Sequence, residues 1–132
     1  MGWRVRALRG ATTVEANTEA AIAAAVAELL DQMVAENDID LEEVVNVIFS
    51  VTADLNACYP ARWARLREGW QYVPLLDVQQ MAVPHDLDRC IRVLLQFNTL
   101  LPQSQIRHVY LHGARHLRPD LDRQRQAASL PS

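Results

Sequence analysis

Arg92 is a charged residue in a segment that otherwise has the pattern of a buried strand. The segment is CIRVLLQF, and strand alternation places Cys90, Arg92 and Leu94 on one face. A guanidinium within a sheet is unfavourable unless an anion balances its charge or carbonyl groups accept its hydrogen bonds. The residues alone leave two interpretations open: a buried ion pair with an acidic side chain, or a binding site for an anionic ligand.

Arg9 is a second cation in a comparable position. Residues 3–10 predict a strand, and Arg9 ends the face that also carries Trp3, Val5 and Ala7. Two arginines on neighbouring strands would suit a dicarboxylate, because a planar guanidinium can form two parallel hydrogen bonds with each carboxylate. The sequence contains no lysine, so every basic side chain apart from histidine is an arginine.

The histidines raise a competing hypothesis of a metal site. His108, His112 and His116 repeat every four residues, which on a helix would form one face. The segment HVYLHG is typical of a strand instead, and there four residues span about 13 Å, too far for two ligands of one ion. We therefore expect no metal. Tyr110, between two of these histidines, is by itself more typical of a packed aromatic residue than of a catalyst.

The absence of lysine excludes several kinds of enzyme. Without lysine the chain cannot form a Schiff base, anchor pyridoxal phosphate or build a P-loop. The glycines are too scattered for a loop that cradles phosphate. Cys58 and Cys90 lack the sequence signature of an activated thiol, and they are too few for a disulfide framework or a zinc cage. We expect no cofactor.

The length of 132 residues predicts one domain, residues 1–118, followed by a polar and loosely ordered tail, residues 119–132. A net charge of −3 argues against nucleic acid as the main partner. The apolar runs are too short to span a bilayer, and the N-terminus lacks the apolar region of a signal peptide. We therefore expect no membrane association and a cytoplasmic location, which a chain with two cysteines also fits.

Hydrophobic periodicity predicts one long helix and several strands. The helix begins at Asn17 or Thr18 and runs to about Ala35. Its apolar stripe comprises Ile22, Val26, Leu30 and Met33. Residues 44–52 are almost continuously apolar and rich in valine, which predicts a strand buried on both faces.

The second half of the chain adds three further strands and a short helical turn. The turn lies between Pro60 and Gly69, because proline can begin a helix and glycine can end it. The strands are WQYVPLLDV, CIRVLLQFNT and IRHVYLHG, and Pro74 places the first of them at a sheet edge or bulge. The order β-α-β-β-β-β predicts an α+β fold, a mixed β-sheet with one principal helix packed on it.

Six segments of the chain resemble, in order, the AroH-type chorismate mutases: RGATTVEANTEAAI, TADLNACYPARWAR, GWQYVPLL, CIRVLLQFNT, PQSQIRHVYL and LRPDL. They span residues 9–121. The resemblance implies a homotrimer whose three sheets form a pseudo α/β-barrel, with the helices outside and active sites at the subunit interfaces. It also implies the cofactor-free pericyclic rearrangement of chorismate to prephenate in phenylalanine and tyrosine biosynthesis.

The same resemblance implies roles for individual residues. Arg9 would bind a substrate carboxylate, Arg92 would contact the ether oxygen and a carboxylate, and Tyr110 would add a hydrogen bond. The other residues implied to bind the substrate are Tyr59, Ala61, Arg62, Arg65, Leu75, Leu76, Leu117 and Arg118.

Two positions depart from the family pattern. Gln80 stands where the family usually has a glutamate that orients the key arginine, and Asp77 stands where it often has a cysteine. One hypothesis is that the carboxylate has moved, so that Asp77 accepts the hydrogen bond from the substrate hydroxyl and Gln80 is a neutral replacement. The other is that Asp77 is a solvated loop residue and the enzyme is weaker. Two alternative functions follow: a non-catalytic trimer that binds chorismate-like dicarboxylates, and a different small-molecule enzyme on the same scaffold.

Overall fold

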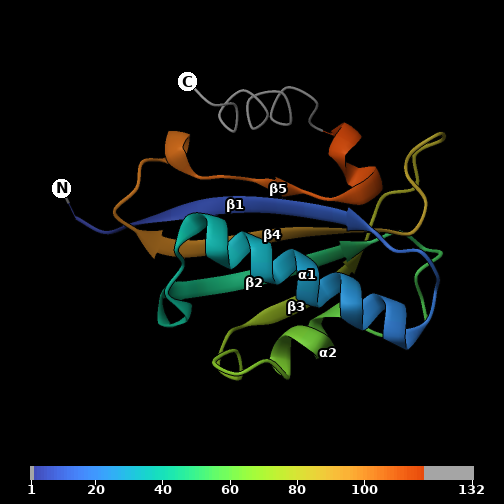
Figure 1. Cartoon of the computed structure of the whole chain (residues 1–132), viewed down its shortest axis with the longest axis horizontal. Coiled ribbons are helices and arrows are strands. Elements are labelled where there is room, and N and C mark those ends of the chain that lie inside the picture. Colours follow the sequence, from blue (N-terminus) through green and yellow to red (C-terminus); the bar gives the residue numbers. More distant parts are fainter. Residues whose placement is uncertain (1, 118–132) are drawn as a thin grey trace, which may run out of the picture.

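A five-stranded mixed sheet with two α-helices is the framework of the chain (Figure 1). The computed structural model describes residues 2–117, so Arg118 and the tail expected at 119–132 lie outside the described residues. In chain order the elements are β1 (Arg4–Thr13), α1 (Glu19–Asn37), β2 (Val44–Val51), α2 (Pro60–Arg65), β3 (Leu75–Gln79), β4 (Cys90–Thr99) and β5 (Val109–Tyr110). Three short 3-10 helices, η1 (Leu41–Glu43), η2 (Gln103–Gln105) and η3 (His112–Leu117), complete the described part.

The strands lie in the order β3-β2-β4-β1-β5. The long strand β4 pairs antiparallel with both β1 and β2, and the outer pairs β2–β3 and β1–β5 are parallel. The predicted α+β fold with a mixed sheet and one principal helix is therefore confirmed. The strand predicted over WQYVPLLDV is shorter than expected, because β3 begins at Leu75, directly after Pro74. It lies at an edge of the sheet, as predicted.

Helix α1 forms for the local reasons that the sequence indicated. Thr18 is the N-cap, and its side chain accepts a hydrogen bond from the Ala21 N–H at 3.1 Å. The helix ends two residues later than predicted, at Asn37, where Asp38 takes a left-handed conformation. All four residues of the predicted apolar stripe, Ile22, Val26, Leu30 and Met33, are buried.

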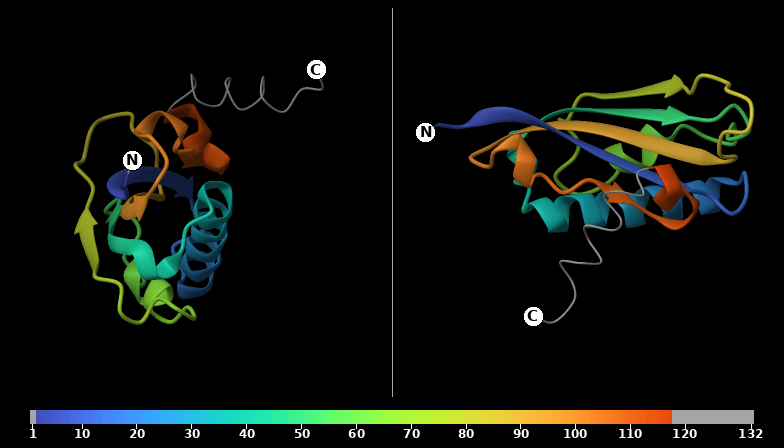
Figure 2. Two further views of the ribbon diagram at one scale, coloured as in Figure 1. Left: turned by 90° about the vertical axis from the view of Figure 1, so that its left-hand side faces the viewer. Right: turned by 90° about the horizontal axis from the view of Figure 1, so that it is seen from above.

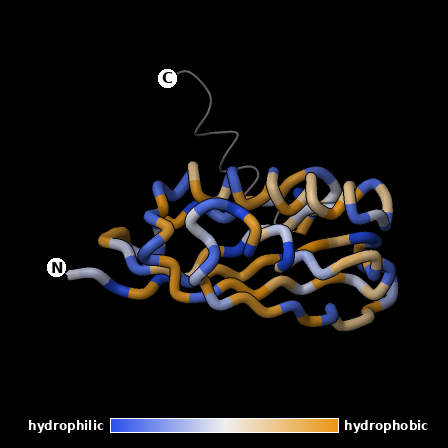
Figure 3. The backbone as a smooth tube through the Cα atoms, turned by 90° about the horizontal axis from the view of Figure 1, so that it is seen from below, coloured by the Kyte–Doolittle hydropathy of each residue, from blue (hydrophilic) through white to orange (hydrophobic). Residues whose placement is uncertain are grey.

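Both α-helices lie on the same side of the sheet (Figure 2, right). The main core fills the space between these helices and the sheet. Hydrophobic residues recur along the strands and along the helix that packs on them (Figure 3). We call the other side the open face. It is formed by Val5, Arg9, Ile48, Ser50, Leu76, Val78, Arg92 and Leu94.

The open face corrects the prediction that residues 44–52 are buried on both sides. Val47 and Phe49 point to the helices and are fully buried, whereas Ile48 and Ser50 are only half-buried. The reason is that one layer of helices covers only one side of the sheet within a single chain. Among the exposed residues of the open face are Val5, Leu76, Val78 and Leu94, each 37% to 56% exposed.

The C-terminal part of the sheet also differs from the prediction. Only Val109 and Tyr110 of the segment IRHVYLHG pair as a strand, because His112 turns the chain with a positive φ of 52° and η3 follows. Side chains continue the ladder in their place. The amide of Gln103 bonds both to the N–H and to the C=O of Ala7, at 3.1 and 2.7 Å, and His108 Nδ1 accepts from the Arg9 N–H at 3.0 Å.

Asn37 is a buried polar residue that ties the end of α1 to this C-terminal segment. Its Nδ2 donates to the carbonyl oxygens of Met33 and Arg107 at 3.0 and 2.9 Å. Its Oδ1 accepts from the Arg107 N–H at 2.7 Å. These bonds place the segment that leads into β5 against the helix, and so they help to position Tyr110.

We predict that Asn37→Ala lowers the free energy of unfolding by about 2 kcal/mol. The reason is that the backbone N–H and C=O of Arg107 lose their hydrogen bonds to the buried Asn37 side chain. Urea denaturation measures this change. Gln32→Ala, an exposed position on the same helix, is the control and should shift stability by no more than about 0.5 kcal/mol. Equal urea denaturation midpoints for the two variants would contradict a stabilising role for the bonds between Asn37 and Arg107.

Candidate active site

One row of residues crosses the open face from edge to edge. Val78, Ser50, Arg92, Ala11 and Tyr110 lie in register on β3, β2, β4, β1 and β5. Paired residues of neighbouring strands point to the same side of a sheet, so these side chains share one surface.

Arg9 belongs to the next row of the same surface. It pairs with Leu94, while Ala11 pairs with Arg92. The two arginines singled out in the sequence therefore lie diagonally across neighbouring strands, on one face, as the dicarboxylate hypothesis requires. The side chain of Arg9 is exposed.

Arg92 is paired with an acidic residue that the sequence analysis did not single out. Its Nη2 lies 3.1 Å from Oδ1 and 3.0 Å from Oδ2 of Asp86, in the loop between β3 and β4. The side chains of Arg92 and Asp86 are 19% and 25% exposed. No motif marks Asp86; the one available signal was an acid six residues before an arginine within a strand. The interpretation of Arg92 as an ion-paired residue is thus confirmed, yet its Nε is buried without a hydrogen-bond partner.

Tyr110 carries a second buried group without a partner. Its hydroxyl makes no hydrogen bond in the described structure. The ring packs in a small cluster with Ala11 and Ala114, against which Leu87 and Leu117 also pack. Leu117 therefore lies against the cluster that contains Tyr110, and its role toward a substrate stays a prediction. Two donors of this row are thus buried without partners, which makes the row a candidate ligand-binding surface.

Gln80 lies next to this row. Its Oε1 accepts a hydrogen bond from the Ser50 hydroxyl at 2.9 Å, and its N–H continues the β3 ladder by donating to the Val51 carbonyl at 2.7 Å. Since Ser50 pairs with Arg92, the amide of Gln80 is held on the same surface as the arginine.

The environment of Asp77 excludes one of the two hypotheses for this residue. It pairs with Phe49, so it points to the helix side of the sheet, and its Oδ1 accepts from the Ala61 N–H in the first turn of α2 at 3.0 Å. It is a half-buried strand residue, and its interpretation as a solvated loop residue is wrong. Burial raises the pKa of the Asp77 carboxyl, and the hydrogen bond from Ala61 opposes that rise only in part. One chain does not bring Asp77 to Arg92.

The residues around α2 also lie away from the row. Tyr59, the N-cap of α2, is 73% exposed, and Arg65 is exposed at its last turn. The guanidinium carbon of Arg62 lies 5.1 Å from the centre of the Trp63 ring, and its Nη1 lies 3.9 Å from Oε1 of Glu19. The other implied residues divide between the two sides. Leu75 packs against the main core, Ala61 is buried in it, and Leu76 is exposed on the open face.

The metal hypothesis gains no support from the histidines. His112 Nε2 lies 2.7 Å from Glu28, and His108 is engaged at the edge of β1. Within residues 2–117 no group of three His, Cys, Asp or Glu side chains is placed to hold a metal ion. Cys90 is buried beside Arg92, and this burial raises the pKa of its thiol, although the arginine opposes the rise.

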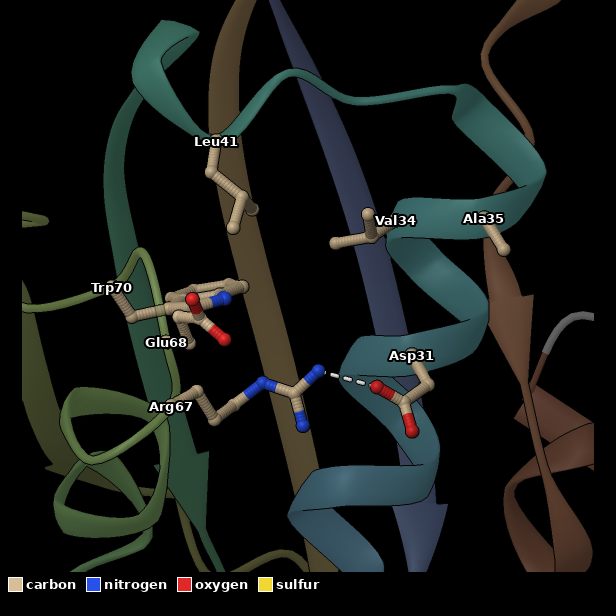
Figure 4. Close-up of a pocket in the computed structure, with 7 residues that line it drawn as sticks. All are labelled: Asp31, Val34, Ala35, Leu41, Arg67, Glu68 and Trp70. Atoms are coloured by element: carbon tan, nitrogen blue, oxygen red, sulfur yellow. Dashed lines mark hydrogen bonds and ion pairs between the residues drawn. The ribbon is translucent and has the colours of Figure 1, made fainter.

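Two hollows of the surface lie apart from the row. The first has a volume of about 410 Å³ and is lined by side chains from α1, η1 and the loop after α2 (Figure 4). There Arg67 pairs with Asp31 and lies 5.8 Å from the centre of the Trp70 ring. The second, of about 560 Å³, lies between α1 and the end of β1, beside His112. None of the helices in the described part is long and apolar enough to cross a membrane.

Comparison with known proteins identifies the family to which this fold belongs. The family model described as chorismate mutase type I matches residues 5–121. Chorismate mutase AroH of Bacillus subtilis (strain 168) is 47% identical over 117 residues, which is 89% of this chain and 92% of that protein. Chorismate mutase AroH of Thermus thermophilus is 50% identical over 119 residues, 89% of this chain and 97% of that protein.

A solved chorismate mutase from Clostridium thermocellum has the same fold, with a TM-score of 0.80 at 41% identity. The match covers 83% of this chain and 97% of that one. The small α+β fold is thus that of an isomerase. The chain belongs to the type I chorismate mutase family.

The environment of Asp77 predicts a pH effect on stability. A carboxyl whose pKa is raised on folding destabilises the folded chain when it ionises. Relative to Asp77→Asn, wild-type stability should therefore fall as pH rises from about 4, the usual aspartate value, through the raised pKa of the folded chain. The amide oxygen of the variant can still accept from Ala61. Urea midpoints of both proteins across this range measure the difference, and a difference independent of pH would refute the assignment.

Proposed function

We propose that this chain rearranges chorismate to prephenate on the row of the open face that holds Arg92, without a cofactor and in the cytoplasm. The observation that carries the proposal is the pair of buried groups without partners, Arg92 Nε and the Tyr110 hydroxyl, which lie in register beside Arg9. The substrate carries two carboxylates and an ether oxygen. The row together with Arg9 supplies two cations and a hydroxyl donor for these groups.

The chemistry requires charge stabilisation rather than proton transfer. As the C–O bond of chorismate breaks, negative charge builds on the ether oxygen. A fixed cation at that oxygen favours the transition state over the ground state. In the proposal Arg92 contacts the ether oxygen and a carboxylate, Arg9 holds a carboxylate, and Tyr110 adds a hydrogen bond.

Selection of the compact substrate conformer supplies the rest. Arginines fixed on two strands can hold a dicarboxylate with its reacting carbons close together, so the entropic cost of that geometry is met on binding. An acceleration of about a millionfold requires about 8 kcal/mol. One charged hydrogen bond at the ether oxygen together with conformer selection can reach that value.

Assembly is part of the proposal, because the candidate residues lie on two sides of the sheet. Arg9, Arg92 and Tyr110 face the open side, whereas Tyr59, Arg62, Arg65 and Asp77 belong to α2 and the helix side. A site that contains both sets needs α2 and β3 of one chain next to the open face of another. We therefore propose an oligomer with active sites at its interfaces, and we take it to be the homotrimer that the family resemblance implies. The exposed apolar residues of the open face support this, since such a surface is usually covered.

The role of Asp77 toward the substrate stays a prediction within this arrangement. Its carboxylate would have to meet a substrate held by the arginines of a neighbouring chain, while keeping its bond to Ala61. Gln80, in contrast, lies on the arginine side, where its amide can hydrogen-bond to the ligand as a neutral group.

The first test is turnover by the purified protein. Incubation with chorismate should reduce its ultraviolet absorbance and yield prephenate. Binding of chorismate without any turnover would instead favour the non-catalytic dicarboxylate-binding function, and neither binding nor turnover would refute the proposed substrate.

Arg92→Ala should lower kcat/KM by at least about 10³-fold, because it removes the cation at the developing charge. Steady-state kinetics measure the loss, and light scattering should show the same trimer as the wild type. Arg4→Ala is a matched control, since Arg4 is an exposed arginine at the start of β1. Near-normal activity of Arg92→Ala would refute the assignment.

Leu94→Asp should yield a folded monomer without activity, because it places a charge in the middle of the proposed interface, at the residue that pairs with Arg9 in the sheet. Light scattering coupled to gel filtration measures the mass. Leu100→Asp, an exposed position beyond the end of β4, should remain a trimer. A trimeric Leu94→Asp would exclude the open face as the interface.

A further inference from the structure

We propose that Asp86 is the carboxylate that positions the Arg92 guanidinium for the reaction. The inference rests on the function proposed above and adds a residue that neither the sequence pattern nor the family comparison indicates. Asp86 acts through Arg92 and has no contact of its own with the reacting atoms.

The contact fixes one end of the guanidinium and leaves another free. Both carboxylate oxygens of Asp86 contact the same nitrogen, Nη2 of Arg92, at 3.1 and 3.0 Å. Because the guanidinium is planar and rigid, holding one nitrogen restricts the orientation of the whole group. The Nε–H remains buried and without a partner, and so it is available to an acceptor on the ligand.

Asp86 is itself held in place by its loop. Its Oδ1 also accepts from the Leu87 N–H at 2.8 Å, and its own N–H donates to the Val83 carbonyl at 3.2 Å. The Leu87 side chain packs against the cluster that contains Ala11 and Tyr110. The carboxylate is therefore anchored to the same row as the arginine.

The far end of the loop is anchored as well. Arg89 has a positive φ of 44° and donates from its N–H to Asp54 Oδ2 at 2.9 Å and from its Nε to the Val14 carbonyl at 2.9 Å. Burial acts to raise the pKa of the Asp54 carboxyl, but hydrogen bonds from Thr52 and Arg89 outweigh it and leave the pKa lowered. Asp54 is thus a charged acceptor that fixes the loop three residues beyond Asp86.

Gln80 does not perform this task in the described structure. Its Oε1 is bonded to the Ser50 hydroxyl, and its amide carries no charge to balance a guanidinium. A half-buried cation needs a nearby anion, and Asp86 provides one within hydrogen-bond distance. In this proposal Asp86, in the loop between β3 and β4, takes the positioning role, and Asp77, on the other side of the sheet, does not.

The opposite role, in which Asp86 occupies the place of a substrate carboxylate, predicts different kinetics. A competing carboxylate weakens binding, so its removal would lower KM and leave kcat intact. A positioning carboxylate acts on the transition state, so its removal lowers kcat with little change in KM. The free Nε and the anchored loop favour positioning.

The experiment compares wild type, Asp86→Asn and Asp86→Asn with Gln80→Glu, in chorismate turnover by the full chain. We expect Asp86→Asn to lower kcat about 100-fold with KM changed less than about threefold. Gln80→Glu should restore at least about a tenth of the lost rate in that background, because it returns a carboxylate to the surface that Arg92 shares. Asp88→Asn, an exposed acid of the same loop, is the control and should keep wild-type kcat.

Asp86→Ser tests whether a folding defect explains the loss of activity. The serine hydroxyl can still accept a hydrogen bond from the Leu87 N–H, although the charge is lost. This variant should show the same fall in kcat at the wild-type melting temperature. A near-normal kcat for the Asp86 variants, a lowered KM at unchanged kcat, or an equal fall in Asp88→Asn would overturn the proposal. If the wild type itself does not turn over chorismate, the proposed function fails and this inference fails with it. An active wild type with active Asp86 variants rejects the inference alone.

Discussion

The guanidinium of Arg92 inside the sheet is the constraint on which the other features of the site depend. A cation on the middle strand cannot be solvated as it would be in water, so nearby groups must balance it. Asp86 provides the charge. The loop that carries it is bonded to Val14, the residue directly after β1, and packs through Leu87 against the cluster that contains Tyr110. The same arrangement leaves Nε without a partner. Balance of charge by the protein and a remaining donor for a ligand therefore coexist on one side chain.

A second constraint is that one chain covers only one face of its sheet. The helices bury the side that carries Val47 and Phe49, and the opposite side keeps exposed apolar residues around the arginines. A site that uses the open face and the surroundings of α2 has to be assembled from more than one chain. Oligomerisation and catalysis would then have the same origin, since the contact that covers the apolar residues also closes the site.

The edge of β1 shows how irregular segments are positioned as precisely as strands. Gln103 and His108 bond to the backbone of Ala7 and Arg9, and Asn37 bonds to Arg107. Side chains thereby replace a ladder that lasts only two residues in β5. This explains why Tyr110 reaches the row although most of the segment around it is not a strand.

The sequence by itself determined α1, the strands β1 and β4, and the face of the sheet on which each of the two arginines lies. Thr18 as N-cap, the apolar stripe of α1 and the alternation in β1 and β4 depend on neighbours within a few residues, and such local periodicity survives in the fold. The resemblance of its motifs to a known family predicted the reaction that the chain catalyses. The tertiary structure decided which charge Arg92 meets, which side of the sheet Asp77 faces and how short β5 is. Those outcomes depend on the path of a loop and the register of paired strands, which bring together residues that no local spacing relates.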